Sequence, residues 1–126
     1  MKDSALGPAR SEVVILRTGH RLGSHYEGAR HVSRARALGF MDERIRSITA
    51  SPDGEDGLLV RAVDALFDSH RIPADLEAEL AATIGREAVF DLIATVGFYS
   101  VLGGILLTYD TPVDPAIADE LTRKPI

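Results

Sequence analysis

The stretch Ser24-His25-Tyr26-Glu27-Gly28-Ala29-Arg30-His31 decides how this part of the chain folds. Ser24 and Glu27 have the Ser-x-x-Glu spacing of a capping box, in which the two side chains bond the free amides of a helix start. This spacing predicts a helix that begins after Ser24 and ends at Gly39. On such a helix Glu27 and His31 share one face, where a carboxylate and an imidazole can exchange a proton.

Outward from this helix, the apolar residues recur every three or four positions, and alternating strand patterns are nearly absent. The sequence therefore predicts an all-α fold in one domain of 126 residues. The turn-rich stretch from 51 to 57 is expected to be a mobile linker, and Asp110, Pro112 and Pro115 are expected to break helical structure. The further helices are predicted over residues 11–22, 42–50, 58–70, 75–84 and 87–107.

The last of these helices is the most apolar part of the chain. Its segment 92–107 falls short of the ~20 apolar residues that a membrane span needs, so we expect a buried helix and no membrane partner. Gly97, Gly103 and Gly104 let other backbones come close to it. A helix that is apolar on most of its circumference has to be covered on nearly all sides. Two explanations remain open, a central core helix and an interface in a homo-oligomer.

Composition excludes several classes of function. With 14 basic and 19 acidic side chains the net charge is −5, so nucleic acid is not an expected partner. The absence of cysteine excludes disulfides, thiol redox chemistry and thiolate metal sites, and it suits a reducing cytoplasm. Residues 1–10 are polar and lack the pattern of a secretory signal, so we expect a cytoplasmic protein.

Four sequence elements follow one another along the chain: Glu12-Val13-Val14-Ile15-Leu16-Arg17, Tyr26-Glu27-x-x-x-His31, Asp64-Ala65-Leu66 and Gly97-Phe98-Tyr99. They resemble the carboxymuconolactone decarboxylase and alkylhydroperoxidase D-like family over residues 10–113. The resemblance implies a six-helix alkylhydroperoxidase D-like bundle, a small-molecule substrate and a homo-oligomer, a trimer or a hexamer. Many members carry additional N-terminal helices before the first of these elements, and we expect no counterpart of them in residues 1–10.

The peroxidase branch of this family carries, as the resemblance implies, a glutamate twelve positions before a Cys-x-x-Cys-x-x-x-His motif. Glu12 and His31 match its outer members, whereas Ser24 and Glu27 occupy the two cysteine positions. Neither a sulfenic acid nor a disulfide can form here, so thiol peroxidase activity is not expected.

The decarboxylase branch works without a cofactor, and acid/base residues suffice for its chemistry. We therefore expect a cofactor-independent lyase or isomerase that moves a proton in decarboxylation or isomerisation of a small oxygenated acid or lactone. Glu27 and His31 would move the proton, Glu12 would orient the relay, and Tyr26 would lend a hydroxyl. Ser24 and Tyr99 are the expected substrate-binding residues, and apolar residues of the helices 58–70 and 87–107 are expected to line the pocket.

Each candidate also has a purely structural interpretation. Glu27 can bond the Ser24 backbone as a capping residue, and His31 can be a core histidine. Glu12 lies in the first turn of its helix, where the macrodipole favours a carboxylate, and the tyrosines can simply pack. The protein would then be a non-catalytic, oligomeric binding or scaffold member of the family.

A metal site is not expected. His20, His25 and His31 are the histidines that come closest to a ligand set. The first two lie in or beside a predicted turn, and the sequence has no H-E-x-x-H element, so three converging ligands are not indicated.

Overall fold

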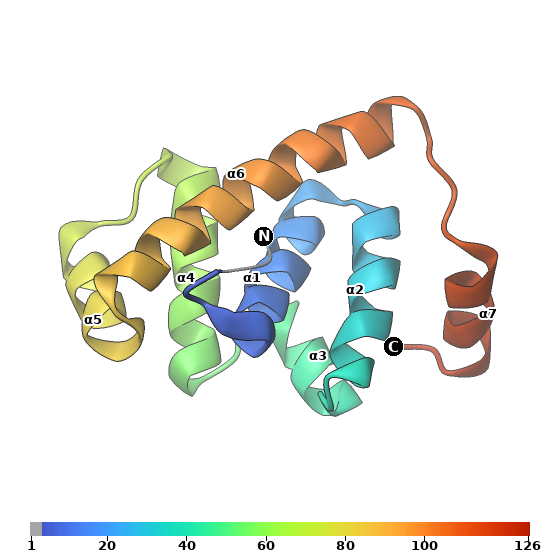
Figure 1. Cartoon of the computed structure of the whole chain (residues 1–126), viewed down its shortest axis with the longest axis horizontal. Coiled ribbons are helices and arrows are strands. Elements are labelled where there is room, and N and C mark those ends of the chain that lie inside the picture. Colours follow the sequence, from blue (N-terminus) through green and yellow to red (C-terminus); the bar gives the residue numbers. More distant parts are fainter. Residues whose placement is uncertain (1–3) are drawn as a thin grey trace.

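A computed structural model describes residues 4–126, and this part of the chain contains seven helices and no strand. The all-α prediction is therefore confirmed for the described residues. The helices are arranged as shown in Figure 1. In chain order they are α1 (Gly7–Leu22), α2 (His25–Ala37), α3 (Asp42–Ile48), α4 (Gly54–Ser69), α5 (Ala74–Ile84), α6 (Arg86–Thr108) and α7 (Pro115–Arg123).

Helix α1 is the centre of the fold, because α2, α4 and α6 all pack against it. Its apolar run Val13–Leu16 is almost completely buried, and it meets core side chains from α2, α3, α4, α5 and α6. Arg17 joins α1 to α4 through a two-pronged ion pair with Asp64, both N–O distances being 2.9 Å. The packing fixes the side of α1 that faces α2, and this side carries Glu12.

The helix count differs from the predicted six because a seventh helix follows the proline-rich stretch. Asp114 accepts a hydrogen bond from the Ala116 amide, and Pro115 occupies the first turn of α7. Aspartate at the cap and proline at the first helical position are a recognised start signal, so these residues begin a helix instead of only ending one. Glu120 of α7 bonds Ser33 and Arg36 of α2, which ties the C-terminal segment to the bundle.

The predicted linker from 51 to 57 is also partly helical. Helix α4 begins at Gly54, whose φ of 63° turns the chain into the helix, so only the first residues of this stretch connect α3 to α4. Gly57 lies where a Cβ would come within 2.5 Å of the Pro52 carbonyl oxygen. Glycine at position 57 therefore allows the close approach that lets α4 begin early.

Helix α6 crosses the molecule along one edge, as Figure 1 shows, and only one of its sides is covered. Ala88, Val89, Leu92, Val96 and Gly103 are buried, whereas its large apolar side chains on the other side are 42–69% exposed. The helix is long and apolar enough to cross a membrane by length and composition alone, and 28% of its most apolar window is buried. The expectation of a helix buried on nearly all sides is wrong for the single chain, because no described helix packs over the outer side of α6. The exposed large side chains are Phe90, Ile93, Phe98, Val101, Ile105 and Leu107.

Candidate functional site

The structure brings Glu12 of α1 and His31 of α2 together in the interior. The Glu12 Oε2 atom lies 2.7 Å from His31 Nδ1, and the two residues are 2% and 5% exposed. The other carboxylate oxygen, Oε1, lies 2.9 Å from Nε of Arg34, one turn further along α2. Both oxygens of Glu12 are therefore occupied by nitrogen partners, and the carboxylate holds the imidazole in a fixed orientation.

Glu27 is the second buried carboxylate, and it is only 2% exposed. Its backbone amide donates to Ser24 Oγ at 3.2 Å, so the first half of the predicted capping box is present. The second half is absent, because the Ser24 amide donates to the Gly19 carbonyl oxygen at 3.0 Å. Neither carboxylate oxygen of Glu27 has a hydrogen-bond partner among the described residues. The interpretation of Glu27 as a carboxylate bonded to the start of its own helix is therefore wrong.

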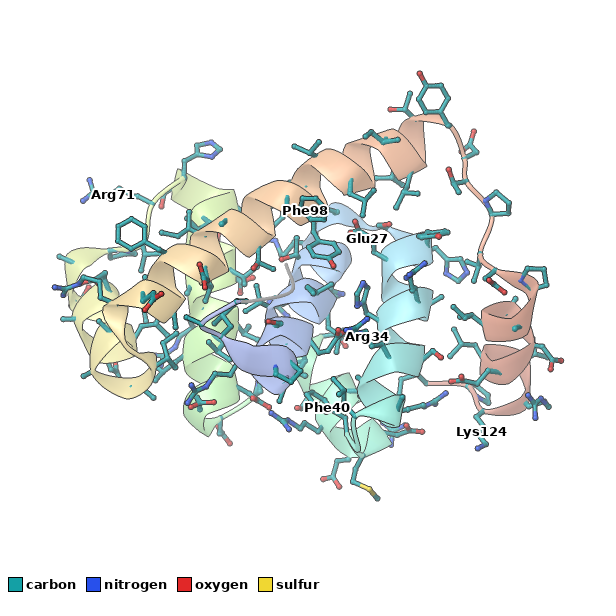
Figure 2. The ribbon with its side chains drawn as sticks, viewed as in Figure 1. Glu27, Arg34, Phe40, Arg71, Phe98 and Lys124 are labelled. Atoms are coloured by element: carbon teal, nitrogen blue, oxygen red, sulfur yellow. The ribbon has the colours of Figure 1, made fainter. Side chains whose placement is uncertain are left out.

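The surroundings of Glu27 are two close glycines and an apolar side chain. It lies between the start of α2 and helix α6, as Figure 2 shows. A Cβ at Gly103 would come within 2.7 Å of Leu22 Cδ1 and within 3.5 Å of Glu27 Oε2, and a Cβ at Gly19 would also touch Glu27. Burial raises the pKa of the Glu27 carboxyl above its ordinary value, and the nearby His31 offsets part of this rise.

Tyr99 of α6 packs against the His31 ring. The two ring centroids are 5.4 Å apart and the rings stand edge to face, at 88°. Burial raises the pKa of the Tyr99 phenol, and the charge of Glu12 raises it further. The phenol is therefore a hydrogen-bond donor at neutral pH.

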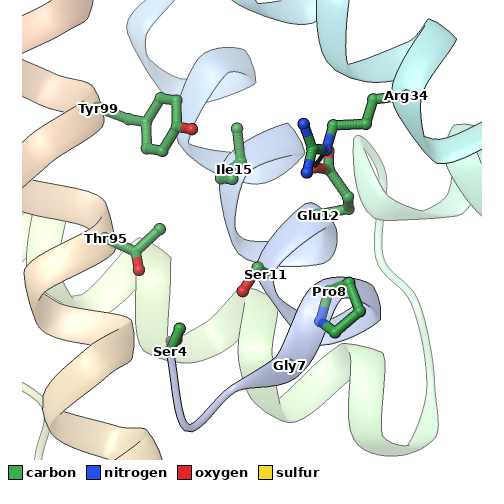
Figure 3. A pocket seen from close by; sticks show the side chains of 9 residues that line it. All are labelled: Ser4, Gly7, Pro8, Ser11, Glu12, Ile15, Arg34, Thr95 and Tyr99. Carbon is green, nitrogen blue, oxygen red and sulfur yellow. Dashed lines mark ion pairs between the residues drawn. The ribbon is translucent and has the colours of Figure 1, made fainter. Parts of the chain in front are cut away.

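Glu12 and Tyr99 both line a pocket with a volume of about 470 Å³. Figure 3 shows it between the start of α1, helix α6 and the Arg34 side chain of α2, with the Tyr99 hydroxyl directed inward. No residue of α4 lines it, so the expectation that apolar residues of the fourth helix form the pocket is wrong. The reason is that α4 packs against the opposite side of α1, through the Arg17–Asp64 pair and the core. The lining residues are Ser4, Gly7, Pro8, Ser11, Glu12, Ile15, Arg34, Thr95 and Tyr99.

The remaining predicted site residues lie elsewhere. Ser24 is buried at the start of α2, where its hydroxyl caps the helix. Tyr26 lies beside Leu106 and Leu107, and its hydroxyl is 3.5 Å from Arg30 Nη1. Neither residue reaches the 470 Å³ pocket, and Glu27 and His31 do not line it either. Two of the six predicted residues, Glu12 and Tyr99, thus face the pocket directly, and His31 contacts both of them.

Arg34 is not among the site residues that the sequence predicts. The signal that indicates it is its position three residues after His31, which places both on one face of α2. A cation there can reach the same carboxylate as the imidazole, and the structure shows that it does.

Within residues 4–126, no group of three or more histidine, aspartate or glutamate side chains could hold a metal ion. No family model, curated protein or solved structure matches the chain.

Proposed function

We propose that this protein is a cofactor-independent acid/base enzyme that moves a proton on a small oxygenated acid or lactone, as the resemblance to the carboxymuconolactone decarboxylase family implies. The observation that carries the proposal is the pairing of Glu12 and His31 at the wall of a pocket. Glu27 supports it, because a buried carboxylate without a hydrogen-bond partner costs folding free energy and is retained most readily where it has a task.

The geometry changes the order of the relay that the sequence predicts. Glu12 is the carboxylate that meets the substrate, and its oxygens accept the proton of an acidic C–H bond, whose electron pair passes into the adjacent carbonyl. Tyr99 donates a hydrogen bond to the carbonyl oxygen as negative charge develops there. His31 shares the proton with Glu12, and the proton returns to a carbon of the substrate. Glu27, whose pKa is raised by burial, is a second carboxyl group close enough to His31 to interact with its charge.

Exchange of substrate protons for solvent deuterium tests this proposal without knowledge of the natural substrate. The protein in deuterium oxide is incubated with a panel of unsaturated γ-lactones and β,γ-unsaturated acids, and deuterium at the carbon next to the carbonyl is followed by proton NMR. We expect protein-dependent exchange for at least one compound, at a rate above that of heat-denatured protein. A panel without any exchange would contradict an acid/base function.

The outer side of α6 favours a second candidate, the oligomeric binding or scaffold protein. No charged residue lies between Asp91 and Asp110, and the exposed stripe of α6 combines the large side chains Phe98 and Val101 with Gly97 and Gly104. Small residues beside large ones allow two helices to pack closely. A stable interface covers about 800 Å² on each partner, and the six exposed large side chains of α6 would form part of that area.

We propose that a second copy of the chain covers this stripe, in the trimer or hexamer that the resemblance implies. A membrane is the less favoured cover, because the inner side of α6 packs against α1, α4 and α5 and would have to separate from them to cross a bilayer. The enzyme and the scaffold candidates share this interface, and the deuterium exchange assay separates them.

Val101→Glu is expected to convert an oligomer into a monomer, because it places a charge at the centre of an apolar contact. Sedimentation velocity measures the change. Met41→Glu is the matched control, since Met41 is 75% exposed but lies outside α6. A monomeric wild-type chain that floats with phosphatidylcholine vesicles would show that a membrane covers the stripe instead.

A further inference from the structure

Several hydrogen-bond donors at the pocket have no partner among the described residues. Both oxygens of Glu12, its one carboxylate, are occupied by His31 Nδ1 and Arg34 Nε. The two terminal nitrogens of Arg34 have no partner in the part of the chain that the structure describes, and the same holds for the Tyr99 and Ser11 hydroxyls. A ligand that completes these hydrogen bonds has to bring acceptors.

The charge in the pocket favours an anion with a single negative charge. The Arg34 guanidinium presents a planar pair of donors, a geometry that matches the two oxygens of a carboxylate. Its side chain is 63% exposed, so a ligand that enters from solvent reaches it first. Glu12 lies behind it and repels a second negative charge, which disfavours a phosphate dianion.

We propose that Arg34 is the substrate-recognition residue of the pocket and that it binds the carboxylate of a small organic acid, with Tyr99 and Ser11 donating further hydrogen bonds. This inference rests on the proposed function for the identity of the reaction, and it narrows the substrate class from acids and lactones to carboxylates. A carboxylate held by the terminal nitrogens of Arg34 lies beside Glu12, because Nε of the same guanidinium contacts Glu12 Oε1. The rest of the ligand then extends along Tyr99 and Ile15 into the pocket.

Binding of benzoate tests this inference, with benzamide as its neutral counterpart of the same shape. Dissociation constants are measured by NMR titration in bis-Tris chloride buffer, with inorganic phosphate as a third probe. We expect benzoate to bind the wild-type protein about tenfold or more tightly than benzamide does, and phosphate to bind less tightly than benzoate. Arg34→Met is expected to reduce benzoate affinity to that of benzamide, and Arg34→Lys to give an intermediate value.

Arg30→Met is the matched control, because Arg30 is an exposed arginine on the same helix that does not line the pocket. It is expected to leave benzoate affinity unchanged. Equal affinities for benzoate and benzamide, an unchanged affinity in Arg34→Met, or an equal loss in Arg30→Met would each overturn the inference. Tighter binding of phosphate than of benzoate would overturn the assignment to carboxylates.

The benzoate-binding experiment tests the role of Arg34, and the deuterium-exchange experiment tests the enzymatic function, so one proposal can be wrong while the other holds. Glu12→Gln removes the proposed proton acceptor and also the negative charge behind Arg34, so it is expected to bind benzoate at least as tightly as the wild-type protein. If the wild-type protein binds benzoate through Arg34 but catalyses no deuterium exchange, the proposed enzymatic function is contradicted and the proposed role of Arg34 is not.

Discussion

Glu12→Gln is expected to lower the rate of deuterium exchange by about 10²- to 10⁴-fold, the usual contribution of a positioned general base. Glutamine has the shape of glutamate, but its amide nitrogen cannot accept a proton. It also offers a single oxygen, so it cannot accept hydrogen bonds from both His31 and Arg34, which contact separate oxygens of Glu12. The exchange rate is measured by proton NMR with the most reactive compound of the panel.

Two variants make this result specific to the site. Glu87→Gln makes the same chemical change at an exposed residue of α6, and we expect it to keep the wild-type rate. Glu12→Asp keeps the charge on a shorter side chain and should recover part of the rate. Glu12→Gln can keep the hydrogen bond with His31 through its one oxygen but loses the ion pair with the exposed Arg34, so it is also expected to lower the free energy of unfolding by about 1 kcal/mol or less. The deuterium exchange of Glu12→Gln is therefore measured well below the melting temperature of this variant. An exchange rate equal to that of the wild-type protein would show that Glu12 is not the general base.

Glu27→Met is expected to have a higher free energy of unfolding than the wild-type protein above neutral pH, by about 1–3 kcal/mol. In the wild-type protein the carboxyl is buried without a hydrogen-bond partner, and methionine of similar length fills the same space without a charge. Stabilisation by removal of a charged side chain is typical of a residue that is kept for activity.

The free energy of unfolding of the wild-type protein is expected to depend on pH through Glu27. Burial raises the folded-state pKa of Glu27, so over the range between the unfolded and the folded pKa the folded chain keeps a proton that the unfolded chain releases. The stability of the wild-type protein therefore falls as pH rises through this range, whereas Glu27→Met lacks this contribution. Urea unfolding at several pH values measures the difference, which should be small at pH 4 and grow with pH. If Glu27→Met is less stable than the wild-type protein at every pH, the claim that the buried Glu27 carboxylate has no hydrogen-bond partner is wrong.

The sequence predicts the parts of this fold that depend on local signals. Ser24 caps α2 as the capping box predicts, and Gly23 adopts the left-handed conformation that ends α1. Helix α7 also has a local signal, Asp114 followed by Pro115, which the prediction of Pro112 and Pro115 as helix breakers does not use. Helix starts and stops are thus available from sequence, provided that proline is weighed as a first-turn residue as well as a breaker.

The arrangement of the site depends on contacts between distant segments, which local patterns do not contain. The spacing of Glu27 and His31 predicts that they share a helix face, but not that the Glu12 carboxylate contacts the imidazole at 2.7 Å. It also cannot predict that Gly103 of α6 lies against Glu27, or that Glu27 does not line the pocket. The outcome depends on how α6 crosses α1 and α2, and this crossing follows from packing across the whole core.

Helices α1, α2 and α6 all contribute to the site. Glu12, His31 and Tyr99 come from one of these helices each. None of these helices holds two of the three groups, so no single helix supplies a pair of them. Loss of the packing between any two of these three helices therefore separates the three side chains. Heat inactivation and melting of this protein should consequently coincide.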